Sequence, residues 1–301
     1  MIIYTDDFKM ENDLKSSYPP PRDKGLLEAG EKYFTESQSQ LCYFKQGCMS
    51  LDRMQSWKDC FTFFNSKFFE LINASKNEGH NQELLDEATL QLAVYLASFG
   101  MYRNQFFLQS NRRILLPVIK SLFKKLDGHM PGEKLTVDLI KELMLNIQQS
   151  LMNSFKNIQR LVETKEIVVS GGLDNLKNEC LHATDTAVTK ILMGITGCVP
   201  ACDTNYRLAV TFLNKELCKG NKLPRDITAE TVNDVLLFVK ANYGFFSPWV
   251  GYLGVEGKRH NLVMRVFDLY MWQLGFAENE RIKRDKKEKR QLKKRRQKVV
   301  M

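Results

Sequence analysis

The sequence predicts an all-α fold, a multi-helix globular array that ends in a basic tail, either helical or disordered. Two observations lead to this prediction. Apolar residues recur every three or four positions along most of the chain after residue 25, which is the spacing of one helix face. Runs that alternate apolar and polar residues are almost missing, and only residues 166–169 resemble a short strand. With 301 residues, 44% of them hydrophobic, the chain can bury a sizeable core.

The first two predicted helices are recognised by their periodicity and their end residues. Ser56, a residue type preferred at helix N-caps, precedes residues 57–76, whose apolar side chains recur at helical spacing. Residues 84–99 have the same periodicity and are followed by Gly100, which suits a helix C-terminus. We therefore expect one helix over 57–76 and a second over 84–99.

The central and C-terminal helices follow from similar signals. Residues 101–126 are predicted to form a helix pair or one helix kinked at Pro117, because proline interrupts helical hydrogen bonding. After a turn cluster, Thr136 is expected to cap a long helix. Four later helices are predicted over residues 184–196, 203–218, 228–243 and 258–275, the last with an aromatic stripe expected in the core.

Composition divides the chain into three parts. Residues 1–24 contain a polyproline-like SYPPPR motif and are expected to be flexible. Residues 25–279 are predicted to form one helical domain, which could contain two lobes with a cleft, and residues 280–301 form the basic tail. No run of about 18 uncharged apolar residues occurs, so we expect no membrane contact. Seven scattered cysteines and an acidic N-terminus without signal-peptide features predict a cytoplasmic protein.

The positive charge of the chain is concentrated in the tail. The chain carries a net charge of +9, and residues 281–298 contain twelve Lys or Arg against Asp285 and Glu288, a net +10. The remaining residues are therefore almost neutral. Such a block attracts phosphate groups because binding releases condensed counterions. The tail predicts a nucleic-acid partner, the alternative being a solvated helical extension.

Several kinds of catalytic site are excluded by the absence of their motifs. The sequence has neither a Gly-x-Gly-x-x-Gly motif after a strand nor a phosphate-binding loop. The four histidines are widely separated, so a helix-borne zinc site has no support. Cys198 and Cys202 form a lone CxxxC pair, which cannot complete a tetrahedral zinc site and is expected to be buried as small hydrophobic residues. We expect no metal and no cofactor.

The most informative stretch is residues 182–210. Thr184 or Asp185 can cap a short helix, which Gly194 and Gly197 are expected to end. After the turn at Pro200, Asp203 lies where the next helix should begin, and aspartate is a preferred N-cap. Amide hydrogen bonds and the helix dipole favour an ionised carboxylate at such a position. A fixed carboxylate of this kind can stabilise a developing cation or orient a water molecule, whereas the alternative is a plain helix cap.

The segment Val-Pro-Ala-Cys-Asp-Thr-Asn-Tyr-Arg at 199–207 resembles the Pro-x-x-Asp turn of the helix-hairpin-helix DNA glycosylases. This resemblance covers about 30 residues of the chain, and it implies a glycosylase-like fold in which Asp203 stabilises an oxocarbenium-like sugar. Residues 182–185 replace the glycine-rich hairpin of the family, so Lys190 and Arg207 are expected to contact phosphates instead. The position of the lyase lysine falls near Thr184, which implies a monofunctional enzyme. An exposed helix charge is the alternative for Arg207.

A second predicted surface lies at residues 99–113, where aromatic side chains alternate with polar ones. Such a surface can stack a flipped or unpaired base. The prediction assigns nucleic-acid contacts and a base pocket here, and the alternative is a helix–helix corner with the phenylalanines in the core. The nucleic-acid contacts are assigned to Tyr102, Arg103, Arg112 and Arg113, and the base pocket to Phe99 and Phe106.

Together these features predict a monofunctional DNA glycosylase that flips a modified or damaged base out of double-stranded DNA. The enzyme would hydrolyse the N-glycosidic bond, with Asp203 as its catalytic residue. Residues 99–113, together with the Lys-Ile-Leu-Met-Gly and Pro-Ala-Cys-Asp segments, also resemble uncharacterised bacterial proteins. This resemblance would allow a role in DNA repair or phage defence. The alternative prediction is a non-enzymatic nucleic-acid-binding adaptor.

Overall fold

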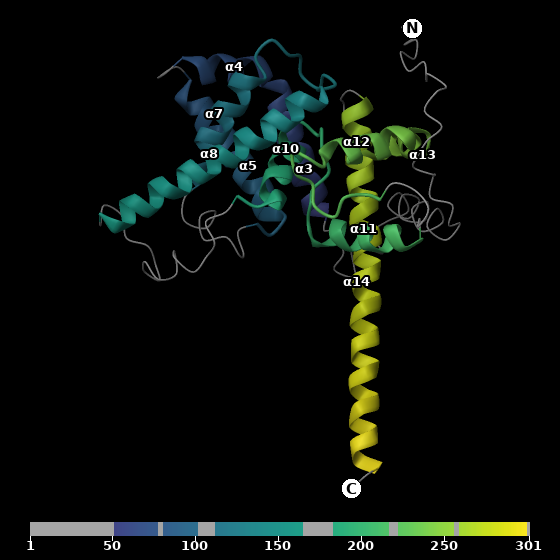
Figure 1. The fold of residues 1–301 in the computed structure, drawn as a ribbon. Helices are drawn as coiled ribbons and strands as arrows, with labels where there is room; N and C mark the ends of the chain where they lie inside the picture. The colour runs from purple at the N-terminus through teal and green to yellow at the C-terminus, as the bar shows by residue number, and fades with distance from the viewer. Residues whose placement is uncertain are drawn as a thin grey trace.

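The computed structural model describes residues 51–77, 81–101, 112–164, 183–216, 222–255 and 259–299, and every regular element in these ranges is a helix (Figure 1). The predicted all-α fold is thus confirmed. Predictions for residues 1–24 and 166–169 lie outside the described ranges. The elements are α3 (Leu51–Ser66), α4 (Phe68–Lys76), α5 (Gln82–Ser98), η1 (Arg112–Leu115), α7 (Leu116–Lys125), α8 (Val137–Glu163), α10 (Asp185–Ile195), α11 (Thr204–Glu216), α12 (Val232–Ala241), α13 (Tyr243–Phe246), η2 (Ser247–Leu253) and α14 (Arg259–Val299).

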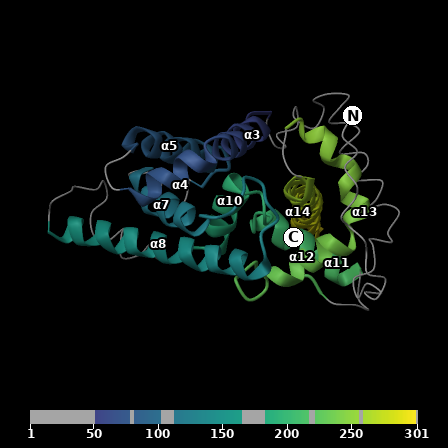
Figure 2. The ribbon, with the colours of Figure 1, turned by 90° about the horizontal axis from the view of Figure 1, so that it is seen from above.

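The N-terminal helices pack on one another through aromatic side chains. Helices α3, α4, α5 and α7 lie together, and α8 runs along α7 (Figure 2). Phe64 stacks on Phe123 with ring centroids 5.9 Å apart, and Phe68 meets the same ring edge-on at 5.7 Å. Residues of α3, α4 and α7 that are far apart in the sequence thereby share one core. Burial of these rings is the dominant contribution to the packing of this part.

The helix predicted over 57–76 is two helices, separated at Lys67. The proposed N-cap Ser56 was wrong, because α3 begins at Leu51 and Ser56 lies inside it. The Ser56 hydroxyl is buried and has no hydrogen-bond partner among the described residues. The next residue, Trp57, is fully buried, so packing of α3 into the core outweighs the local preference of serine for a cap.

Two predicted helix ends are confirmed, and of the two alternatives for residues 101–126 the helix kinked at Pro117 is not observed. Gly100 follows α5 with φ of +74° and donates its N–H to the Ala97 carbonyl at 2.8 Å. The Thr136 hydroxyl accepts the Leu139 N–H at 3.3 Å and caps α8. Pro117 does not kink a helix, since it occupies the first turn of α7, where a missing N–H has no intrahelical partner to lose.

Helix α14 organises the C-terminal half of the protein. Helix α11 crosses it, and α13 and η2 also contact it (Figures 1 and 2). The aromatic stripe predicted for the core is buried at Phe267 and Tyr270 and half-buried at Trp272 and Phe276. The Phe267 ring packs on that of Phe246, with ring centroids 5.4 Å apart. The helix predicted over 258–275 continues without a break to Val299, so the basic tail is helical and not disordered.

The predicted helices over 184–196, 203–218 and 228–243 correspond to α10, α11 and α12 within a few residues where they are described. Among the described ranges, no helix has an apolar stretch long enough to cross a membrane.

Candidate functional site

The site begins at helix α10, which lies in the middle of the protein against α3, α5 and α8. Thr184 caps it by accepting the Ala187 N–H at 3.2 Å, as predicted. Gly194 was predicted to end this helix but lies inside it. A Cβ at Gly194 would be 2.8 Å from Tyr95 Cδ1, so glycine allows α10 to approach α5 closely. Gly197, with φ of +66°, follows the helix and reverses the chain.

Asp203 occupies the position predicted for it, at the start of α11. Its Oδ1 accepts the Tyr206 N–H at 3.0 Å, so the N-cap prediction is confirmed. The turn before it is held by buried side chains: Asp268 Oδ1 accepts the Ala201 N–H at 2.7 Å, and Thr189 Oγ1 accepts the Cys202 N–H at 2.9 Å. These hydrogen bonds fix the turn and with it the orientation of the Asp203 carboxylate. The Asp203 side chain is 21% exposed, so solvent reaches this carboxylate.

Three residues predicted for function meet at this point. Lys190 projects from α10, with its Nζ 4.0 Å from Asp203 Oδ2. The same ammonium donates to the Phe99 carbonyl at 3.4 Å and lies 5.3 Å from the centre of the Phe99 ring. The Lys190 side chain is only 5% exposed, so these contacts with Asp203 and Phe99 are buried. Lys190 thus links Asp203 to Phe99, the residue that follows α5.

Beneath these residues lies a buried ion pair that the sequence reasoning missed. Arg265 and Asp268, one turn apart on α14, form a salt bridge and are both buried. The Arg265 guanidinium lies 4.8 Å from the centre of the Trp57 ring and 5.8 Å from that of Phe99. A signal was present, because an arginine and an aspartate interrupt the apolar run from 262 to 272. Buried charges of this kind are rare unless they are paired.

We call Lys190, Asp203, Arg265 and Asp268 the buried charge cluster. Burial raises the pKa of Asp268, and the nearby Arg265 and the Ala201 N–H oppose that rise. Burial also raises the pKa of Tyr95, whose hydroxyl is buried without a hydrogen-bond partner among the described residues. The two carboxylates of the cluster lie within one another's electrostatic field, and only Asp203 is appreciably exposed. Asp203 is therefore the member of the cluster that a substrate approaching from solvent would contact.

Arg207 lies on α11 but is engaged elsewhere. Its Nε donates to Asp226 Oδ1 at 2.6 Å, and one terminal nitrogen donates to Thr186 Oγ1 at 3.4 Å. Partial burial is the largest single effect and opposes the charged form, but the hydrogen bond to Asp226 together with the nearby Cys202, Asp226 and Asp185 outweighs it and raises the pKa of Arg207. A phosphate contact at Arg207 would compete with this ion pair.

The second predicted surface can be placed only in part. Tyr102, Arg103 and Phe106 lie outside the described residues, and the backbone of Arg112 and Arg113 opens η1. Phe99 is half-buried, with its ring centre 5.0 Å from that of Tyr95. It therefore contributes to the helix corner and to the surroundings of Lys190.

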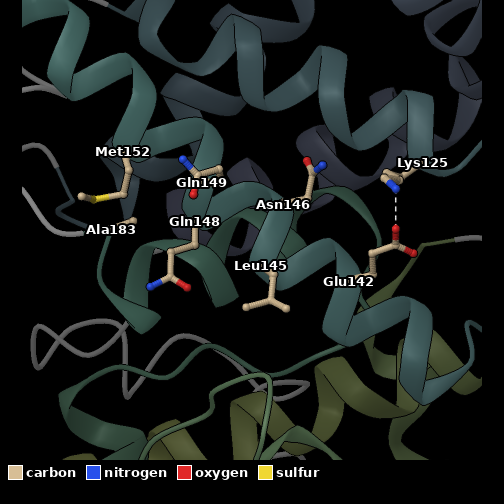
Figure 3. Close-up of a pocket in the computed structure, with 8 residues that line it drawn as sticks. All are labelled: Lys125, Glu142, Leu145, Asn146, Gln148, Gln149, Met152 and Ala183. Carbon is tan, nitrogen blue, oxygen red and sulfur yellow. Dashed lines mark hydrogen bonds and ion pairs between the residues drawn. The ribbon is translucent and has the colours of Figure 1, made fainter.

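A separate hollow is lined by none of the predicted site residues (Figure 3). Helix α8 supplies most of its lining, and an ion pair between Lys125 and Glu142 joins α7 to α8 at one end. The other lining residues are Leu145, Asn146, Gln148, Gln149, Met152 and Ala183. The amide side chains make this hollow polar, and its two titratable groups, Lys125 and Glu142, are paired with one another.

Cys198 and Cys202 are buried, as predicted, and burial raises the pKa of each thiol to about 11. Both thiols are therefore protonated near neutral pH. Within the described ranges, no group of three or more histidine, cysteine or acidic side chains is placed to hold a metal ion.

No family model matches the chain, and comparisons with curated proteins and with solved structures also found no match.

Proposed function

We propose that this protein is a DNA glycosylase-like enzyme that excises a modified or damaged base, with Asp203 as its catalytic residue. The observation that carries the proposal is the state of the Asp203 carboxylate. One oxygen is held by the Tyr206 N–H at the start of α11, the other faces Lys190 Nζ, and the group remains accessible to solvent. The resemblance of residues 199–207 to the glycosylase turn agrees with this arrangement.

The chemistry needs a fixed negative charge beside a sugar that becomes positive. When the N-glycosidic bond breaks, its electrons leave with the base and C1′ develops an oxocarbenium-like charge. A carboxylate that is already oriented stabilises this charge without reorganising during the reaction. Water then adds its oxygen to C1′ and its proton replaces the sugar on the base. Asp203 can orient that water, and Lys190 fixes the carboxylate by its own buried position.

The substrate must be extruded from the duplex, because the target atom cannot be reached inside stacked DNA. The basic part of α14 would contribute affinity for the phosphate backbone independently of sequence. In this proposal the partner is DNA, and none of the steps of the reaction uses a metal ion.

Replacement of Asp203 by asparagine tests the proposal. Asparagine is as good an N-cap as aspartate, so Asp203→Asn should keep the fold and DNA binding while removing the charge. Abasic sites would be counted in DNAs of different modification content, including heavily modified phage DNA. We expect base release to fall by about 100-fold or more, as for loss of a preorganised electrostatic group. Asp138→Asn, at the exposed start of α8, is a matched control that should remain active.

A second candidate is a nucleic-acid-binding adaptor without catalytic activity. It is favoured by the plain capping bond of Asp203, which a helix start can use for stability alone. Unmodified protein that releases no base from any of these DNAs, but binds them in a salt-sensitive manner that requires residues 281–301, would support the adaptor. Base release that persists in Asp203→Asn would refute the catalytic assignment.

A further inference from the structure

Helix α14 supports the turn that carries Asp203. Asp268 of α14 accepts the Ala201 N–H at 2.7 Å, two residues before Asp203. About two turns further on, Gly275 packs directly on the first turn of α11: a Cβ there would lie 2.7 Å from the Asn205 Cα and closer to its carbonyl group. The backbones of the two helices therefore touch at Gly275. This contact leaves no room for the turn to shift relative to α14.

The same helix continues into the basic tail without interruption. From Gly275 to Arg281 the axis advances about 9 Å, at 1.5 Å per residue. Acidic and basic side chains pair along the helix where it leaves the body. Arg281 contacts Glu278 at 2.7 Å and Asp285 at 3.4 Å, and Lys283 contacts Glu280 at 2.7 Å. Such pairs favour a helix over a flexible hinge at this point.

The positive charges of the projecting part surround the helix. Residues 281–292 contain seven Lys or Arg, at 281, 283, 284, 286, 287, 289 and 290, and these side chains are exposed. At about 100° per residue they leave no angular gap wider than about 80°. A membrane-surface helix needs one broad apolar face, but the only apolar residues here are Ile282 and Leu292. The pattern therefore favours a partner that presents negative charge on more than one side.

Duplex DNA has this property. Its major groove is about 12 Å wide, admits an α-helix and is walled by phosphates on both sides. Figure 1 shows that the lower part of α14 projects beyond the other described helices, so a duplex can approach it. Charge on all sides of the helix matches phosphates on both walls of the groove.

We propose that α14 is a rigid strut, which binds duplex DNA along residues 281–292 and holds that DNA at a fixed position relative to Asp203. The inference rests on the proposed function in taking Asp203 as the reactive group, and it adds that the basic helix positions DNA in addition to increasing affinity. A flexible basic tail would supply the affinity but not the position.

The test separates binding from positioning. The photoreactive residue p-benzoylphenylalanine would replace Thr204, which is exposed and adjacent to Asp203. In one variant Gly-Ser-Gly-Ser is inserted between Glu280 and Arg281, which breaks the strut and keeps every charge. The control carries the same four residues after Met301. Anisotropy measures binding to a fluorescein-labelled 30-bp duplex, and crosslinking is measured with the duplex saturated.

We expect the three proteins to bind the duplex with affinities within about 3-fold, since the phosphate-binding charge is unchanged. Crosslinking per bound duplex should fall at least 5-fold in the variant with the inserted hinge and stay unchanged in the control. Circular dichroism would verify that the helical body of each protein is folded. Single-stranded DNA of the same length should bind more weakly.

Equal crosslinking in the hinge variant, or no crosslinking in the uninterrupted chain while DNA is bound, would overturn the strut. So would DNA affinity that survives deletion of residues 281–301, or single strands that bind as tightly as the duplex. Base release is scored separately. Hinge-sensitive crosslinking without base release refutes the proposed reaction alone, and base release with hinge-insensitive crosslinking refutes the strut alone.

Discussion

The contact between Gly275 and Asn205 makes a specific prediction about stability. Alanine normally stabilises the interior of a helix relative to glycine by about 1 kcal/mol. At Gly275 the added Cβ would lie 2.7 Å from the Asn205 Cα, whereas carbon atoms pack best at about 3.5–4.0 Å. The obstacle is backbone, which cannot rotate away, so α11 and α14 must separate by about 1 Å or more. Overpacking of this kind costs about 3 kcal/mol at the upper end of its usual range.

The net effect of Gly275→Ala is therefore a loss of about 2 kcal/mol in the free energy of unfolding, the overpacking cost less the gain in helix propensity. Gly244→Ala is the matched control, because Gly244 lies in α13 and a Cβ there would meet nothing within 4 Å. Alanine at that position should be neutral or stabilising by up to about 1 kcal/mol. Urea unfolding followed by circular dichroism gives both values. A Gly275→Ala protein as stable as the unmodified chain would refute the backbone contact between α11 and α14.

Two further predictions concern buried titratable groups. Because burial raises the pKa of Asp268, the folded protein holds that proton more tightly than the unfolded chain, where aspartate titrates near about 4. The stabilising contribution of this proton is present below pH of about 4 and is lost as pH rises through the raised value, so the stability of the unmodified protein relative to Asp268→Asn should decrease over that range. Urea midpoints at several pH values measure this difference, and an increase with pH would contradict it. In the folded protein Cys198 and Cys202, whose pKa values are raised to about 11, should resist alkylation at pH 8 and react after unfolding. Peptide mass spectrometry after a short iodoacetamide pulse measures this, and rapid labelling of either native thiol would contradict their burial.

Local signals were sufficient for most of the helices and for the candidate carboxylate. Thr136, Thr184 and Asp203 were recognised as caps because a cap is a contact between a side chain and an amide two or three residues away. Gly100 was recognised for a similar reason, since a left-handed residue after a helix is a local requirement. These features depend on residues close together in the sequence.

The same signals failed where packing decided the outcome. Ser56 has the chemistry of a cap, but burial of the α3 face around Trp57 extends that helix beyond it. Gly194 has the chemistry of a helix end, but it serves as the point where α10 passes Tyr95. The phosphate contact expected of Lys190 stays a prediction, and only the tertiary structure places its ammonium beside Asp203 and the Phe99 carbonyl. In each case a neighbour distant in the sequence determined the role of the residue.

The sequence by itself thus determined the helical class of this protein, the charge of its tail and the carboxylate at the start of α11, because periodicity, charge and capping are local properties. Only the tertiary structure decided what surrounds Asp203 and how the tail is attached to it. The Asp268 contact with Ala201 and the crossing of α11 by Gly275 join segments about 70 residues apart. Such contacts arise when several helices bury their apolar faces together, and no single helix encodes them.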